Sequence, residues 1–188
     1  MRSFLHSEIA DIYGLGNIPG DPVLAAESGR KLCENVLEPI QAALGPITIR
    51  SAFRSAEVND LGNKKNHQCS NNEKTAANHI WDMRDKDGYI GATTTIIVNS
   101  FVDYYEKTGD WQALAWWIHD HIPEYSYMEF YPLFSAFNIG WHENPDKPKS
   151  ISSRIPNSQG YLTKEGMDNF EGDHSQTYRG CLVKLERR

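Results

Sequence analysis

The chain has few cysteines, and their arrangement excludes two classes of small protein. Cys33, Cys69 and Cys181 are the three cysteines among 188 residues, far apart and never in CxxC spacing. An odd number without paired spacing argues against a disulfide framework and against a cysteine-based zinc knuckle. We therefore expect three reduced thiols.

Long apolar runs and basic clusters are also missing. No segment approaches the ~20 apolar residues of a membrane-spanning helix, and the N-terminal MRSFLHSEIADIYG lacks an apolar run of signal length. The net charge is −6, and the one notable basic cluster is Arg187 with Arg188, so a phosphate backbone has little to bind. We expect a soluble protein, cytoplasmic at synthesis, with no membrane or nucleic-acid partner.

What the chain contains is typical of a folded domain. Hydrophobic residues make up 39% and charged residues 23% of the sequence, and a chain of this length buries roughly 70% of its unfolded surface. We expect one domain over residues 1–150, with a C-terminal extension over 151–188 packed on it. The Pro- and Ser-rich stretch 145–160 is the one candidate linker, and we expect it to wrap the domain.

Apolar periodicity predicts helices in two regions. Residues 23–44 carry apolar side chains at helical spacing, with a kink expected at Pro39 and an end at Gly45–Pro46. Residues 100–122 predict two helices joined at Thr108–Asp110. In contrast, residues 59–78 are rich in Asn, Lys and Gly, a composition typical of an exposed loop.

Three stretches predict strands. ITIRSAF follows the first helix, and HIWDMRD, a KDG turn and the β-branched IGATTTIIV together predict a hairpin. YSYMEFYPLF and AFNIGWHE predict a second hairpin, with Glu129 on its first arm and His142 on its second. The residues after Asn144 read as loop. We expect an α+β fold, in which helices pack on one side of a small antiparallel sheet.

The richest cluster of chemistry lies in AANHIWDMRDKDGY, read together with IGWHE. His79, an aspartate close after it and the distant His142 are a ligand set that can hold Zn²⁺ and leave one position open for water. If HIWDMRD is a strand, residues six apart share a face and residues three apart do not. This favours Asp85 as the ligand, with Asp82 as the alternative.

A second motif carries a family resemblance. SAFRSAEVN at 51–59, after a helix and the run LGPITI, resembles the SGYRSxxxN block of the D-alanyl-D-alanine carboxypeptidase and hedgehog-type zinc peptidases. In that family the block precedes a zinc histidine and aspartate, and a hairpin with an acid and a final histidine motif follows. The order of motifs here is the same, from about Pro22 to Glu143.

The resemblance implies a fold, a cofactor and a set of roles. The fold would be of the hedgehog/D-Ala-D-Ala-peptidase type. The zinc ligands would be His79, Asp85 and His142, the catalytic acid Glu129 and the substrate-contacting arginine Arg54. Zinc-bound water would attack an amide carbonyl, a carboxylate would carry the proton, and a cation would hold the oxyanion or a substrate carboxylate.

The implied function is zinc-dependent hydrolysis of the peptide stems of bacterial peptidoglycan, by carboxypeptidase or endopeptidase action. A bacteriophage lysis enzyme or a virion-associated wall hydrolase fits a chain without an export signal. Glu143 is the alternative to Glu129 as general base. The bond cleaved, the metal used in the cell, the host and the oligomeric state stay open.

Two other functions compete with this interpretation. The chain could be a non-catalytic metal-binding structural or wall-binding module of a phage particle with the same fold. A non-haem iron oxygenase also uses two histidines and a carboxylate, but its short ligand spacing and many-stranded sheet fit poorly here. His119 and His121, in WIHDHIP, are expected to be packing or capping groups rather than metal ligands.

Overall fold

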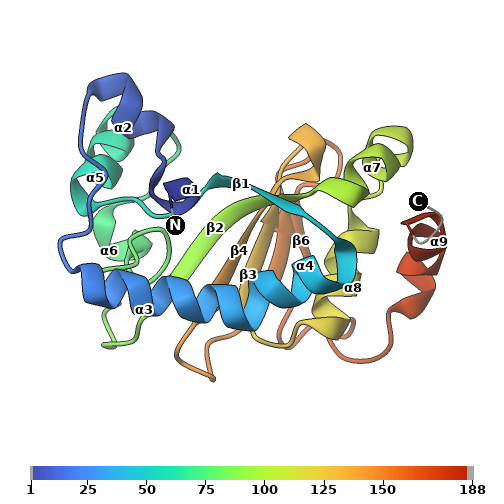
Figure 1. The fold of residues 1–188 in the computed structure, drawn as a ribbon. Helices are drawn as coiled ribbons and strands as arrows, with labels where there is room; N and C mark the ends of the chain where they lie inside the picture. The colour runs from blue at the N-terminus through green and yellow to red at the C-terminus, as the bar shows by residue number, and fades with distance from the viewer. Residues whose placement is uncertain (1, 186–188) are drawn as a thin grey trace.

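The computed structural model describes residues 2–185, which form an α+β fold around a six-stranded mixed sheet (Figure 1). The strands are β1 (Ile47–Ser51), β2 (Gly91–Val98), β3 (Tyr125–Phe130), β4 (Phe137–His142), β5 (Ser150–Ser153) and β6 (Gly160–Lys164). Their order is β1-β2-β4-β3-β5-β6, and every neighbouring pair is antiparallel except β3 and β5. The α+β class is confirmed, but the sheet is mixed and not purely antiparallel, because the chain returns after β4 to the free edge of β3.

The helices form three groups around this sheet (Figure 1). At one end lie α1 (Arg2–Leu5), α2 (Glu8–Tyr13), α5 (Ala56–Lys64) and α6 (Asn72–Thr75). Along the sheet run α3 (Pro22–Leu32), a π-helical turn (Cys33–Leu37) and α4 (Glu38–Leu44). At the other end lie α7 (Val102–Thr108), α8 (Gln112–His121) and α9 (Ser175–Leu185), and single 3₁₀ turns occupy Asn99–Phe101 and Leu133–Ser135.

The helix predicted over residues 23–44 is confirmed, and the structure shows how it accommodates Pro39. A proline inside a helix clashes with the carbonyl four residues earlier and lacks an N–H group. The turn over Cys33–Leu37 is widened to a π-helix, with the Glu38 N–H bonded to the Cys33 carbonyl. The two helices predicted in 100–122 are also present, and the Oδ1 of Asp110 accepts the Ala113 N–H as expected of a cap.

Alternation along the strands divides the sheet into an apolar and a polar face. The apolar face and the long helix share one core of fully buried side chains, among them Leu32, Val36, Ile40, Ile96, Met128, Phe130, Phe137 and Ile139. Because successive side chains of a strand point to opposite faces, Thr95, Glu129 and Asn138 lie on the other face. The polar face is the one that carries the candidate site.

The exposed loop expected over residues 59–78 is only partly correct, since half of this stretch belongs to α5 and α6. Ser55 caps α5 by accepting the Val58 N–H, and Asn71 caps α6 by accepting the Lys74 N–H. The Asn59 side chain is fully buried, and its Nδ2 donates to the Ser70 carbonyl across 2.9 Å. Polar side chains here satisfy backbone groups instead of water, which composition alone does not reveal.

Two further expectations about local structure are corrected. HIWDMRD forms turns and not a strand, with only an isolated bridge from Ile80 to Ala76. The strand-parity argument for Asp85 over Asp82 therefore has no basis. The residues after Asn144 are not simply loop either, because they include β5, β6 and α9. The hairpin of β3 and β4 is confirmed.

The structure also bears on the thiols and on membrane insertion. Cys33, Cys69 and Cys181 form no disulfide, as expected. Within residues 2–185 no helix has the length and apolar character needed to cross a membrane.

Candidate functional site

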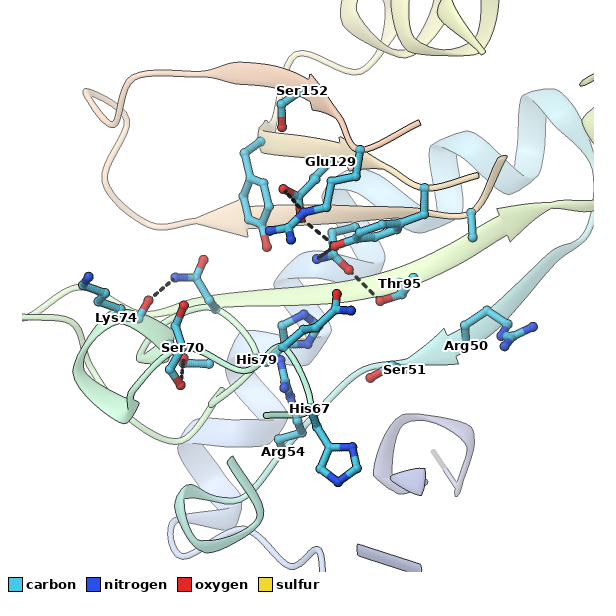
Figure 2. A pocket seen from close by; sticks show the side chains of 18 of the residues that line it. Arg50, Ser51, Arg54, His67, Ser70, Lys74, His79, Thr95, Glu129 and Ser152 are labelled. Carbon is cyan, nitrogen blue, oxygen red and sulfur yellow. Dashed lines mark hydrogen bonds and ion pairs between the residues drawn. The ribbon is translucent and has the colours of Figure 1, made fainter. Parts of the chain in front are cut away.

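A large polar cleft opens on the polar face of the sheet, with a volume of about 820 Å³. Its floor is a row of directly paired residues on four strands: Thr95 opposite Asn138, Asn138 opposite Glu129, and Glu129 opposite Ser152. Figure 2 shows Glu129 and Ser152 on one side and His79 with neighbouring residues of the 67–79 segment on the other. The β3–β4 hairpin, with β2 paired on one side and β5 on the other, thus builds the site.

Hydrogen bonds run without interruption along this floor. Thr95 Oγ1 donates to Asn138 Oδ1 across 2.6 Å, and Asn138 Nδ2 donates to the Tyr131 hydroxyl across 2.8 Å. Tyr131 in turn donates to Glu129 Oε2 across 2.6 Å, while Arg154 Nε donates to Glu129 Oε1 across 2.9 Å. The chain of donors ends on the Glu129 carboxylate, whose orientation is therefore held from two sides.

The charge of the cleft opposes the charge of the whole chain. The lining includes five cationic side chains, Arg50, Arg54, Lys74, Lys147 and Arg154, against two carboxylates, Glu8 and Glu129. One of those carboxylates is already paired with Arg154. In a chain of net charge −6, a concentration of positive charge in a concave site favours an anionic ligand.

Arg54 and His79 lie together in this cleft, because the Arg54 backbone N–H donates to the His79 carbonyl across 2.8 Å. The buried His79 ring places Nδ1 2.9 Å from the Ala52 carbonyl, so Nδ1 carries the hydrogen and Nε2 keeps a lone pair. Burial, and then the charge of Arg54, lower the pKa of His79 to about 3. His79 is therefore a neutral ring at pH 7.

The Arg54 guanidinium has one donor in use and one without a partner. Its Nη1 donates to Cys69 Sγ across 2.6 Å. Its Nε is buried and has no hydrogen-bond partner in the part of the chain that the structure describes. A buried donor without a partner is costly.

Asp85 and His142 are brought together, but outside this cleft. His142 Nδ1 accepts the Asn144 N–H across 3.2 Å, which leaves Nε2 to donate to Asp85 Oδ2 across 3.0 Å. Asp85 Oδ1 accepts the N–H groups of Asp87 and Tyr89, both at 3.0 Å. The hydrogen bonds thus use both nitrogens of the ring and both oxygens of the carboxylate.

The two alternative residues from the sequence also have structural partners. Asp82 Oδ2 accepts the Gly20 N–H across 2.7 Å and the Asp21 N–H across 3.3 Å, which fastens the N-terminal segment. Glu143 Oε2 accepts the Ile90 N–H across 3.0 Å. Neither Asp82 nor Glu143 lines the cleft.

The donor atoms expected for zinc do not meet at one point. Among the described residues, one group of three His, Cys, Asp or Glu side chains has ligand atoms within 4.8 Å of one another, and it is His119, Asp120 and His174. His79, Asp85 and His142 do not form such a group. The chain thus has a His-Asp-His triad that could hold a metal ion, at a different place from the expected one.

Sequence reasoning placed Arg54, His79 and Glu129 in one site, and the cleft contains all three. It missed Thr95, Asn138 and Tyr131, which complete the floor. Polar residues at alternate positions of a strand indicate that one face of the sheet is polar, but they do not indicate which strands lie side by side.

Comparison of the chain with models of protein families, with curated proteins and with solved structures finds no match.

Proposed function

We propose that this protein is a hydrolase that acts on a carboxylate-bearing peptide, and that the cleft is its substrate site. One observation carries the proposal: Arg54, His79 and Glu129, which come from distant parts of the sequence, line the same cleft. The motif that contains Arg54 and the hairpin that contains Glu129 are those that resemble the peptidoglycan peptidases. The proposed substrate is accordingly the peptide stem of bacterial peptidoglycan.

The size and charge of the cleft support such a substrate. A volume of about 820 Å³ lies within the range of sites for ligands of several hundred daltons, roughly 300–1,000 Å³. Cationic side chains such as Arg50 and Lys74 would attract a peptide carboxylate. Arg54 also lines the cleft and lies in the motif that resembles the peptidases, so it would bind a carboxylate oxygen of the substrate.

Glu129 is the residue best placed to move a proton. Each of its oxygens accepts one hydrogen bond, from Tyr131 or Arg154, and each keeps a second lone pair. In the proposed reaction Glu129 takes a proton from the attacking water and returns it to the leaving amine. A cation of the lining would stabilise the oxyanion that forms on the carbonyl.

A fold of the hedgehog-type peptidases and action at the bacterial wall, in phage lysis or from a virion, belong to the same proposal and rest on the motif resemblance. Zinc in the cleft is what the same resemblance implies, but the cleft does not provide its expected ligands. Of the three expected ligands only His79 lines the cleft, so the residues present do not fit a His/Asp/His zinc centre there. In the proposed reaction, therefore, Glu129 alone transfers the proton, and a cation of the lining stabilises the oxyanion.

A second function is favoured by one observation, the closure of Asp85 on His142. A cleft that keeps its ligand-binding cations without an assembled metal centre suits a module that binds wall peptide and does not cleave it. Binding and cleavage are separable in one experiment, because substrate affinity and product release are measured on the same protein.

The test uses the full chain and purified peptidoglycan stem peptide, with calorimetry for binding and chromatography for release of products. We expect Glu129→Gln to bind the peptide as the wild type does and to lose at least about a hundredfold in hydrolysis. Glu124→Gln, an exposed glutamate outside the cleft, is the matched control and should retain full activity. If the wild type binds the peptide without hydrolysing it, the protein is a binding module and not a hydrolase. If the wild type does not bind the peptide, both proposed functions are overturned.

A further inference from the structure

A cluster of histidines and an aspartate lies away from the cleft, where the end of α8 meets the segment before α9. Figure 1 shows α9 next to α8, and the two helices pack against each other. His119 and Asp120 belong to the last turn of α8, and His174 immediately precedes α9. None of the three lines the cleft, so this is a separate site.

His119 is held in the orientation of a metal ligand. Its Nε2 lies 2.7 Å from the Phe170 carbonyl and its Nδ1 lies 2.6 Å from the Tyr125 hydroxyl. A carbonyl accepts only, so Nε2 carries the hydrogen and Nδ1 keeps the lone pair, which the hydroxyl now occupies. Metal-binding histidines typically donate their other N–H to such a carbonyl, which fixes the tautomer and the ring.

His174 is also held by two partners, but both of its ring nitrogens face acceptors, so Nδ1 would have to lose its hydrogen for a metal ion to bind there. Its Nε2 lies 3.0 Å from the Asn169 carbonyl, and its Nδ1 lies 2.7 Å from Asp120 Oδ1. The ring stacks on Trp116 with centroids 3.9 Å apart and an interplanar angle of 8°, so it has little freedom to turn. The other carboxylate oxygen, Asp120 Oδ2, accepts the Tyr178 hydroxyl across 2.9 Å. Second partners thus orient both His174 and Asp120.

The separations suit one small ion. Ligand atoms from the three residues lie within 4.8 Å of one another, and two ligands of a tetrahedral zinc ion are about 3.3 Å apart, given bonds of roughly 2.0–2.1 Å. Small side-chain movements would bring the atoms to that distance. The side chains of His174 and Asp120 are only 12% and 13% exposed, so water would compete weakly for the ion.

The local charge also favours a cation. The C-terminal end of a helix carries partial negative charge, which makes a carboxylate there unfavourable. Asp120 sits in that position at the end of α8. A divalent ion bound between Asp120 and the two imidazoles would offset both the carboxylate and the helix end.

We propose that His119, Asp120 and His174 form a zinc site that fastens the segment before α9 to the end of α8. Two imidazole nitrogens and one carboxylate oxygen are a donor set that zinc accepts, with water or the Tyr125 hydroxyl in the fourth position. The ion would replace the hydrogen bond from Tyr125 to His119. Its role is structural, because it joins two elements that are over fifty residues apart in sequence.

The test measures zinc binding to the full-length protein after treatment with a chelator. We expect one equivalent of Zn²⁺ to bind, and the Tm to rise by roughly 5 °C at a hundredfold excess over Kd. His119→Gln and His174→Gln should each weaken binding by at least about tenfold. His121→Gln is the matched control, because His121 is a neighbour in α8 that stacks on Trp117 and does not belong to the triad.

A second control separates this site from any metal in the cleft. The His79→Gln variant should still bind one equivalent of Zn²⁺. If His79→Gln instead loses zinc binding while His174→Gln retains it, the proposal is overturned. Failure of the wild type to bind zinc would also overturn it and leave the cluster as an ion pair only. If the triad variants do not fold, X-ray absorption of the zinc-loaded wild type decides, with two imidazole ligands in support and fewer against.

Discussion

Nε2 of His142 donates to Oδ2 of Asp85 across 3.0 Å, and this bond ties the end of β4 to the turn that precedes β2. The His142 side chain is 2% exposed and that of Asp85 is 19% exposed, so the bond is largely shielded from water. The same carboxylate accepts the N–H groups of Asp87 and Tyr89 and thereby shapes the turn. Two residues expected to bind zinc thus have a structural role in this arrangement.

The first prediction concerns the stability that this pair contributes. Asp85→Ala should lower the free energy of unfolding by about 1–3 kcal/mol, because it leaves a buried donor on His142 and two N–H groups without their acceptor. Urea denaturation measures the change. Asp87→Ala removes a neighbouring exposed carboxylate and should cost less than about 1 kcal/mol. Equal effects of the two substitutions would contradict the structural role.

The second prediction is a dependence of stability on pH that comes from His79. The unfolded ring protonates near its ordinary pKa of 6.5, while burial and then Arg54 lower the folded pKa to about 3. Between these values the unfolded chain binds more protons than the folded chain. The free energy of unfolding should therefore fall as the pH falls from 6.5, by up to about 1.4 kcal/mol per pH unit.

Urea midpoints between about pH 7 and pH 5.5 test this dependence, above the range near pH 4 in which most carboxylates titrate. Burial also lowers the pKa of His119 and of His142, so the informative quantity is the difference between variants. His79→Gln should flatten the slope, and His6→Gln, which replaces an exposed ring, should leave it unchanged. A slope as steep in His79→Gln as in the wild type would refute the assignment.

The third prediction concerns the buried Asn59. Its Nδ2 donates to the Ser70 carbonyl and to Asn72 Oδ1, which joins α5 to the segment that leads into α6. Asn59→Leu should lower the free energy of unfolding by about 1–3 kcal/mol, since the acceptors lose their donor. Asp60→Ala, on the same helix, is the control, because it removes only an exposed ion pair with Lys64. Its free energy of unfolding should differ from that of the wild type by no more than about 0.5 kcal/mol.

The fourth prediction contrasts two helical glycines. A Cβ on Gly29 of α3 would lie 2.6 Å from Cζ3 of Trp81, whereas one on Gly180 of α9 would meet nothing within 4 Å. Alanine is favoured over glycine in a helix by about 1 kcal/mol. Gly180→Ala should therefore raise the Tm, while Gly29→Ala should lower it because overpacking costs about 1–3 kcal/mol. A rise in both would show that α3 can move away from Trp81.

Local patterns predicted much of the fold. The long helix over Pro22–Leu44, the pair α7 and α8, and the hairpin of β3 and β4 follow from apolar periodicity and turn residues. The helices of 56–75 were missed because residues typical of loops fill much of the stretch, while the caps at Ser55 and Asn71 and the buried Asn59 stabilise them. Strands β5 and β6 were missed because each is short, and β5 joins the sheet only by pairing with β3, after which β6 pairs with β5.

Part of the candidate site could also be predicted from the sequence, and part depends on the tertiary structure. From the sequence alone came the α+β class, the thiols without disulfides and the grouping of Arg54, His79 and Glu129. Those inferences depend on residue type, spacing and motif order, which the linear chain contains. Only the tertiary structure paired Thr95 with Asn138, closed Asp85 on His142 and brought His174 to Asp120. Each is a contact between residues more than forty positions apart, and strand pairing and helix packing decide it.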